Sequence, residues 1–169
     1  MRFLPCVRCG RGLACAPRNS HMKPVHIYDT TLRDGTQGEG FQLSGLDKLR
    51  IAKSLDEFGV DYIEGGWPGA NPTDTAFFAD APRFAHAKFT AFGMTKRAGI
   101  SASNDPGLAA LFEAKADASC FVAKTWDYHV KVALETTNEE NLASIRDSVK
   151  AAKDKGREVL VDCEHFFDG

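Results

Sequence analysis

The chain has 169 residues, of which 43% are hydrophobic and 26% are charged, and its formal net charge at pH 7 is −2. These values are typical of a globular chain with about one domain. No apolar run approaches the ~18 residues that a membrane-spanning helix needs, and the charge balance provides no basic surface for a nucleic acid. We therefore expect neither a membrane protein nor a nucleic-acid-binding protein.

Residues 1–21 differ in composition from the rest, with four arginines, no acidic residue and three of the five cysteines. Cys6 and Cys9 suggest a zinc site, but a closed structural site needs about four ligands, and besides a third cysteine only His21 lies nearby. A transit peptide is also Arg-rich, but this segment has a single serine and no amphipathic period. We predict a non-native or disordered leader, followed by one domain over residues 22–169.

The two remaining cysteines, Cys120 and Cys163, each lie in an apolar run. A cysteine in such a run usually behaves as a small buried hydrophobe. Because the cysteines form no disulfide framework, the expected compartment is a reducing cytoplasm.

Five short apolar segments predict β-strands separated by helices. The strands are expected at residues 25–28, 60–63, 89–92, 119–123 and 159–161. Their spacing is typical of βα units of about 30 residues or more. The alternation predicts an α/β protein with a parallel sheet, either doubly wound or part of a (β/α)₈ barrel. Because both folds place their chemistry at the carboxyl ends of the strands, we look for the site there.

The segments between the strands carry helix signals. A capping box starts the first helix at Ser44, Gly59 ends it, and Ile51, Leu55 and Phe58 form one apolar face. Further helix starts are predicted at Asn71 with Pro72, at Asp105 with Pro106, and at Thr137. Four apolar residues keep the helical period along the last helix, which ends at Gly156: Leu142, Ile145, Val149 and Ala152.

The loop after the first strand concentrates chemically active side chains. Arg33, Asp34 and Gln37 lie there beside three glycines. A solvated turn at Asp34-Gly35 is one interpretation. The other is a carboxylate that holds a divalent cation through its oxygens, next to a guanidinium that binds a planar anion. The chain has no G-x-x-x-x-G-K-[ST] phosphate loop.

Acidic residues also end the second and fifth strands. Glu64 precedes two glycines, which let a ligand approach the backbone closely, and Glu164 follows the last strand. Three carboxylates at one sheet edge, counting Asp34, would repel one another without a cation or a proton among them. This arrangement favours a functional site.

Residues 29–37 resemble the opening signature of the DRE-TIM metallolyases. These aldol and Claisen metalloenzymes include 2-isopropylmalate, homocitrate and citramalate synthases and hydroxymethylglutaryl-CoA lyase. Residues 63–69, 124–129 and 162–169 are similar to the citramalate synthase branch. The resemblance covers essentially all of residues 22–169.

The resemblance implies a (β/α)₈ TIM barrel, of which this chain would hold the first five βα strands as the N-terminal part of a catalytic domain. It implies a metal-assisted condensation of acetyl-CoA with pyruvate to give citramalate, as in isoleucine and leucine biosynthesis. The implied cofactor is Mg, Mn or Zn, and the implied assembly of the full-length enzyme is a homodimer. Alternatives are 2-isopropylmalate synthase, an aldol lyase and a biotin-linked carboxyltransferase.

The resemblance also implies roles for individual residues. Asp34 matches the metal ligand, Arg33 the catalytic arginine that stabilises the forming alkoxide, and Glu164 an acid/base residue. The substrate-binding positions are Gln37, Glu64 and His129. For Glu64, orientation of Arg33 is the alternative role, and for His129 the alternative is packing.

One departure from the family pattern is large. The metal-binding His-x-His of the family does not occur in this sequence, and a TIM barrel takes ~250 residues. We expect the chain to be a fragment that is inactive alone. The alternative from another functional class is a non-catalytic half-barrel that acts as an assembly module.

Overall fold

The structure is a computed structural model that describes residues 24–80 and 82–169. The predictions for residues 1–21, namely the leader and the rejected zinc site, lie outside the described residues. The strands are β1 (Tyr28–Asp29), β2 (Tyr62–Gly66), β3 (Lys88–Met94), β4 (Ala118–Lys124) and β5 (Glu158–Glu164). The helices are the 3-10 helix η1 (Asp34–Thr36), α1 (Gly45–Phe58), α2 (Pro72–Ala79), α3 (Pro106–Glu113), α4 (Asp127–Val132) and α5 (Asn138–Asp154).

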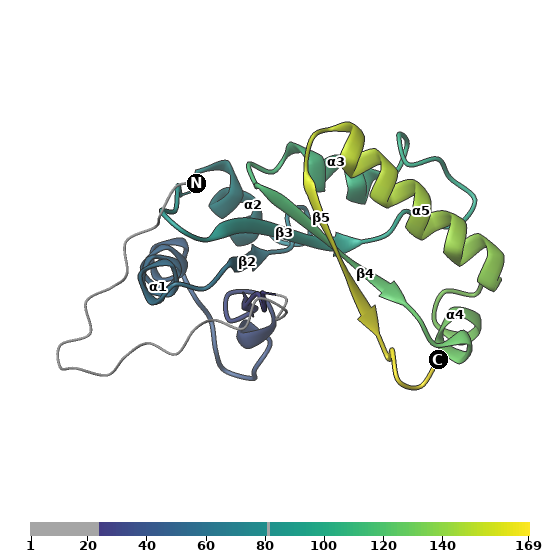
Figure 1. The fold of residues 1–169 in the computed structure, drawn as a ribbon, viewed down its shortest axis with the longest axis horizontal. Coiled ribbons are helices and arrows are strands. Elements are labelled where there is room, and N and C mark those ends of the chain that lie inside the picture. The colour runs from purple at the N-terminus through teal and green to yellow at the C-terminus, as the bar shows by residue number, and fades with distance from the viewer. Residues whose placement is uncertain (1–23, 81) are drawn as a thin grey trace.

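The five strands form one parallel sheet in the order β1-β2-β3-β4-β5. A doubly wound sheet reverses its strand order at a switch point, whereas sequential order with right-handed crossovers keeps the helices on one face. The order therefore identifies five consecutive strands of a TIM-barrel-like fold. Figure 1 shows the twisted sheet with α5 alongside β4 and β5, and α1 and α2 near β2.

The first strand begins later than predicted. The expected strand at residues 25–28 is wrong at its amino end, because the ladder covers only Tyr28 and Asp29 and Val25 is exposed. Ile27 still contacts the sheet, since its carbonyl accepts hydrogen bonds from the backbone N–H groups of Asp61 and Tyr62. The segment that predicted this strand lies at the edge of the sheet, and only the last residues of the segment pair with β2.

The predicted helix starts are confirmed. Ser44 and Asp47 form the capping box of α1, and Gly59 ends that helix in the left-handed conformation at φ 91°. The side chains of Asn71, Asp105 and Thr137 each accept a hydrogen bond from a backbone N–H in the first turn of the helix that follows. The sequence does not predict the short helix α4, whose N-cap residue Trp126 makes no capping hydrogen bond through its side chain.

The apolar faces of α1 and α5 differ from the prediction. Phe58 is 82% exposed and Leu142 is 59% exposed, although both were expected to face the core. The buried stripe of α1 is Lys48, Ala52 and Asp56, and that of α5 is Asn141, Ser144, Ser148 and Ala152. Hydrogen bonds to strand ends, loops and helical residues satisfy these polar side chains, so both helices bury polar residues at low cost.

The main hydrophobic core lies between the helices and one face of the sheet. Its largest buried side chains include Phe78, Phe89 and Phe121, and the rings of Phe78 and Phe89 stack with their centroids 4.7 Å apart. Strand side chains alternate between faces, so Phe92, Cys120 and Val122 form a smaller cluster on the opposite face.

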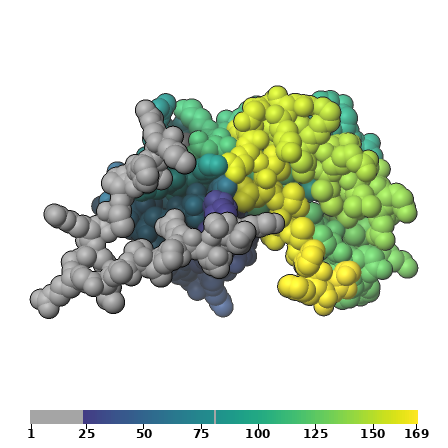
Figure 2. Space-filling model, viewed as in Figure 1, coloured from purple at the N-terminus to yellow at the C-terminus, as the bar shows by residue number. Residues whose placement is uncertain are grey.

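The two cysteines at 120 and 163 have different environments. Cys120 is buried as predicted, but Cys163 is exposed, because β5 is an edge strand with residues open to solvent on both faces. The yellow C-terminal residues lie at the surface of the molecule in Figure 2. Within residues 24–80 and 82–169, no helix has the length and apolar character needed to cross a membrane.

Candidate active site

The face of the sheet opposite the helices carries a cluster of titratable side chains. Each of four strands contributes one of them: Tyr28 on β1, Glu64 on β2, Cys120 on β4 and Asp162 on β5. Arg33 joins them from the turn after β1. Together with Leu160 these residues line a cavity of about 290 Å³.

Short-range hydrogen bonds define the turn that carries Arg33. The Thr30 carbonyl accepts bonds from the backbone N–H groups of Arg33, Asp34 and Gly35 at 3.1, 2.9 and 3.2 Å. The Asp29 carboxylate also accepts from the Thr31 backbone N–H at 3.0 Å. These bonds satisfy the donors of a chain segment that leaves the sheet, so the turn presents Arg33 from a fixed backbone.

The Arg33 guanidinium lies at the centre of the site. Its Nε donates to Glu64 Oε1 at 2.5 Å, and its Nη1 donates to Asp34 Oδ1 at 3.3 Å. The Cζ atom lies 4.0 Å from the centroid of the Phe92 ring. The Arg33 side chain is 16% exposed and that of Glu64 is 1% exposed, so their ion pair is shielded from solvent.

Glu64 is held from both sides, because its second oxygen accepts a hydrogen bond from the Tyr28 hydroxyl. Burial raises the pKa of Glu64, and the nearby Asp162 raises it further, while the bonds from Tyr28 and Arg33 act in the opposite direction. Burial also raises the pKa of Tyr28 far above its usual value. Tyr28 therefore remains a hydrogen-bond donor, and Glu64 takes up a proton more readily than an exposed glutamate.

Cys120 lines the same cavity but is not suited to nucleophilic chemistry. Burial raises the pKa of its thiol to about 11, and the negative charges of Glu64 and Asp162 add to this effect. The thiolate is the nucleophilic form of cysteine. At neutral pH Cys120 is therefore a neutral, apolar part of the wall.

Glu164 lies at the same edge of the sheet but outside the Arg33 cluster. It is in register with Lys124 at the end of β4, and the Lys124 ammonium pairs with its carboxylate. The Thr125 hydroxyl donates to the Glu164 carbonyl at 2.6 Å, which fixes the end of β5. Asp162 lies two residues earlier and thus on the same face of the strand.

The structure places the other two predicted substrate-binding residues away from this cavity. Gln37 is exposed, and its backbone N–H donates to the Asp34 carbonyl at 3.0 Å. His129 lies on α4, where its ring centroid is 4.8 Å from that of Trp126 and 4.4 Å from that of His165. Its buried Nδ1 has no hydrogen-bond partner among the described residues.

The described residues do not form a complete metal site. Within residues 24–80 and 82–169, no three His, Cys, Asp or Glu side chains come together in a way that could hold an ion. Asp34 is 60% exposed beside Arg33 and has an oxygen available beyond its contact with that residue. It can supply one oxygen ligand, whereas a catalytic divalent site needs about three protein ligands.

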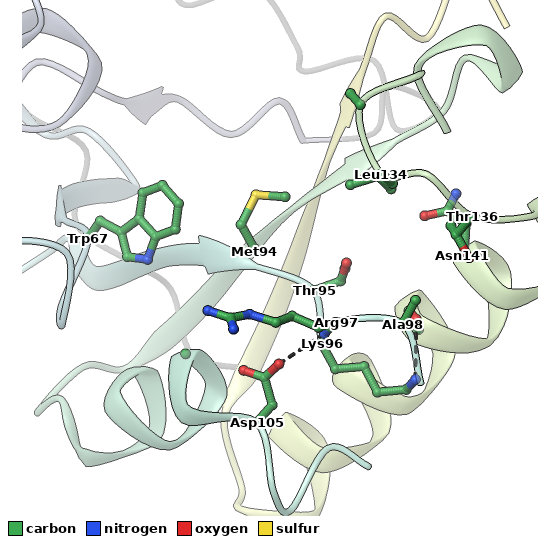
Figure 3. A pocket seen from close by; sticks show the side chains of 13 residues that line it. Trp67, Met94, Thr95, Lys96, Arg97, Ala98, Asp105, Leu134, Thr136 and Asn141 are labelled. Carbon is green, nitrogen blue, oxygen red and sulfur yellow. Dashed lines mark hydrogen bonds between the residues drawn. The ribbon is translucent and has the colours of Figure 1, made fainter. Parts of the chain in front are cut away.

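A second cavity, of about 460 Å³, lies between the end of β3, the start of α3 and the α4–α5 connection. In Figure 3 the Arg97 side chain extends toward Trp67, while the Arg97 backbone N–H donates to Asp105 at 2.9 Å. Lys96 is buried beside this cavity and donates to Ser144 at 3.2 Å and to Glu140 at 3.3 Å. The cavity adjoins the Arg33 site through Trp67, whose ring contacts Phe92.

The sequence alone indicates no site role for four residues that complete the site: Tyr28, Phe92, Cys120 and Asp162. The two-residue strand period held a usable signal for Asp162, because Asp162 and Glu164 must share a face. No local pattern distinguishes the inward Phe92 from the many other phenylalanines of this chain.

Comparisons with known proteins agree with the fold and with the loop motif. The HMGL-like family matches residues 24–169. The chain is 56% identical over 147 residues to an (R)-citramalate synthase of Streptomyces coelicolor and 52% identical over 147 residues to one of Aquifex aeolicus. It is 38% identical over 138 residues to a 2-isopropylmalate synthase of Sulfolobus acidocaldarius.

These alignments cover most of the chain but a minor part of each relative. They include 85% and 86% of this chain and 28% of each of the two citramalate synthases. The 2-isopropylmalate synthase alignment covers 79% of this chain and 33% of that protein. The crystal structure of hydroxymethylglutaryl-CoA lyase from Pseudomonas aeruginosa superimposes with a TM-score of 0.64 at 20% identity, covering 81% of this chain and 45% of that one.

Proposed function

Because the chain belongs to the HMGL-like family, we propose that its residues supply part of the active site of an acyltransferase that condenses acetyl-CoA with pyruvate. The observation that carries the proposal is the shielded Arg33, which Glu64 and Asp34 hold at the carboxyl edge of the sheet. Five relatives named (R)-citramalate synthase, 43% to 56% identical to this chain, support citramalate as the product.

The condensation has three chemical steps. A base removes a proton from the acetyl methyl group, the resulting carbanion attacks the keto carbon of pyruvate, and water then hydrolyses the thioester to release coenzyme A. The second step places negative charge on the former keto oxygen. The N–H groups of Arg33 that Glu64 and Asp34 leave unoccupied are suited to stabilise this alkoxide in a solvent-shielded site.

Glu164 is proposed as the group that moves protons. It lies at the sheet edge with its carboxylate paired to Lys124, so it has an oxygen available for a proton at the acetyl methyl or at the alkoxide. Glu64 is less suited to this step, because Arg33 and Tyr28 already occupy its two oxygens. Its proposed role is to orient Arg33.

A divalent cation, Mg, Mn or Zn, is proposed with Asp34 as one of its ligands, and such an ion would polarise the keto group of the acceptor. Gln37 and His129 are proposed as substrate-binding residues on the strength of the motif match. A homodimer is proposed as the assembly of the whole enzyme, and sedimentation of the purified gene product tests it.

The experiment uses two proteins. One is the purified gene product that contains this chain, and the other is a chimera in which residues 24–169 replace the matching segment of the Streptomyces coelicolor relative. Thiol release from acetyl-CoA is measured with pyruvate and each divalent cation. Pyruvate-dependent thiol release by either protein supports the proposal. Absence of turnover in both, with each protein folded, overturns it.

Two variants of whichever protein is active test the roles of Arg33 and Asp34. Arg33→Ala is expected to lower kcat by at least about a hundredfold, the loss typical of one removed oxyanion donor. Asp34→Asn is expected to weaken divalent-metal binding. Near-normal rates in both variants would contradict the assignments.

The second candidate is 2-isopropylmalate synthase, which the relative at 38% identity favours. It would require a pocket for a bulkier 2-oxo acid. Comparing kcat/KM for pyruvate with that for 3-methyl-2-oxobutanoate decides between the two candidates.

A further inference from the structure

We propose that Phe92 is a positioning residue for Arg33, which it holds through a cation–π contact. The inference rests on the proposed function and extends it to a residue that contacts the guanidinium without a hydrogen bond. Phe92 projects from β3 on the face of the sheet opposite the helices and is 5% exposed. The Arg33 Cζ lies 4.0 Å from its ring centroid, well within the ~6 Å range of a cation–π interaction.

The contacts of Arg33 act in different directions. Glu64 and Asp34 accept hydrogen bonds at the edge of the guanidinium, at 2.5 and 3.3 Å from Nε and Nη1. The guanidinium carbon lies over the face of the Phe92 ring. Two hydrogen bonds at its nitrogens leave the guanidinium free to tilt, and a ring packed against its carbon opposes this tilt.

An aromatic ring suits this position better than a polar side chain. A guanidinium has five N–H donors, and an oxygen acceptor below it would take up one or more of them. A ring face attracts the cation without forming a hydrogen bond to any N–H group. The donors that Glu64 and Asp34 leave free therefore stay available for the alkoxide or for the carboxylate of a 2-oxo acid.

The ring of Phe92 is itself held in place. The Trp67 ring meets it at 79°, with the two centroids 5.6 Å apart, in an edge-to-face contact. The Trp67 backbone N–H donates to Asp74 at 2.8 Å. The Phe92 ring is thus connected to the helix α2 through Trp67 and the turn after β2. It is not a mobile surface ring.

The first test observes the contact directly in the chain labelled with ¹⁵N. Protons above the face of an aromatic ring are shifted upfield, so the Phe92 ring is expected to oppose the downfield shift that the hydrogen bond to Glu64 gives the Arg33 Nε–H signal. Phe92→Leu should move this signal downfield, and the same substitution at Phe89 should leave it in place. Phe89 is a matched control because it lies on the same strand, faces the opposite side and stacks on Phe78.

The second test measures catalysis in the active protein from the assay above, with a graded series of phenylalanines at position 92 that carry one, two or three ring fluorines. Fluorine withdraws charge from the ring face and preserves its shape. The logarithm of kcat is expected to fall stepwise with fluorination, and Phe92→Leu should lower kcat about tenfold, which is within the range of a desolvated cation–π pair. Phe92→Tyr should retain most of the activity, and Phe89→Leu should lower Tm but not kcat.

A flat response of kcat to fluorination, or an unshifted Arg33 signal in Phe92→Leu, would overturn the proposal. Failure of the proposed function looks different. In that case neither the gene product nor the chimera turns over pyruvate, while the ¹⁵N signal still reports whether Phe92 lies against Arg33.

Discussion

Lys48 of α1 and Asp74 of α2 form an ion pair that is nearly withdrawn from solvent, with side-chain exposures of 4% and 8%. The Lys48 ammonium also donates to the Gly65 carbonyl at 3.0 Å, and the second oxygen of Asp74 accepts from the Trp67 backbone N–H at 2.8 Å. The pair thus joins two helices to the turn that follows Glu64. The pair fixes the carboxyl end of β2 in the position where Glu64 contacts Arg33.

Removal of one partner of this pair should be costly. Lys48→Met leaves the Asp74 carboxylate buried without a cation, and losing one partner of a buried pair costs about 3–5 kcal/mol. The double variant Lys48→Met/Asp74→Asn should regain part of that loss, because the neutral amide oxygen still accepts from Trp67. Urea unfolding of Lys48→Met, Asp74→Asn and the double variant measures the coupling free energy between the two residues. Strictly additive losses would contradict a direct interaction between the two charges.

The carboxyl end of β2 should not tolerate a side chain at Gly66. A Cβ added there would lie 2.5 Å from the Asp74 carboxyl carbon, and the residue has φ 145°. Gly66→Ala is therefore expected to lower the free energy of unfolding by about 2 kcal/mol or more, as strain and overpacking together do. Gly45→Ala is the matched control, since no atom lies within 4 Å of its added Cβ. Equal stability of the two variants would show that this strand end can move aside.

Asp56 should make stability depend on acid. Its carboxylate accepts hydrogen bonds from the backbone N–H groups of residues 85, 86 and 87 at 2.8, 2.9 and 2.8 Å. Burial raises the pKa of Asp56, but these three bonds outweigh it and the net pKa lies below the usual 3.8. The folded state therefore binds this proton more weakly than the unfolded state does. Its stabilisation is present above pH 3.8 and is lost as the pH falls through the folded pKa.

Urea unfolding over a pH series tests this dependence. Asp56→Asn should lower the free energy of unfolding at neutral pH, and it should make this free energy change less steeply with pH below pH 3.8. The variant of the exposed neighbour, Glu57→Gln, should behave like the unchanged protein. Identical slopes in the Asp56 variant and the unchanged protein would assign the acid sensitivity to other carboxylates.

Glu164 should affect turnover more than binding. In the active protein, Glu164→Gln removes a group that exchanges protons, and general acid–base catalysis contributes about 10²–10⁴-fold. We expect kcat to fall within that range, with the affinities for pyruvate and for the divalent cation nearly unchanged. Lys124→Met removes the positive charge beside Glu164. Lys124→Arg keeps that charge and is its conservative control. A comparable loss of pyruvate binding in Glu164→Gln would assign it a positioning role instead.

Local signals determined where the helices begin and what the first loop contains. The caps at Ser44, Asn71, Asp105 and Thr137 join residues three positions apart, and such contacts form in any fold that contains the helix. The motif around Arg33 was recognisable for the same reason, because its residues are contiguous. The identity of the strands followed from short apolar segments, with the edge strand β1 as the least accurate.

Only the tertiary structure decided which buried faces are polar and which side chains meet in the site. Phe58 and Leu142 keep the helical period but lie outside, because the sheet and the loops present hydrogen-bonding groups to Asp56 and Asn141 instead. Glu64 and Tyr28 are 36 residues apart, and Glu64 and Arg33 are 31 apart. Contacts of this kind depend on strand order, register and the twist of the sheet, which no segment of the sequence encodes by itself.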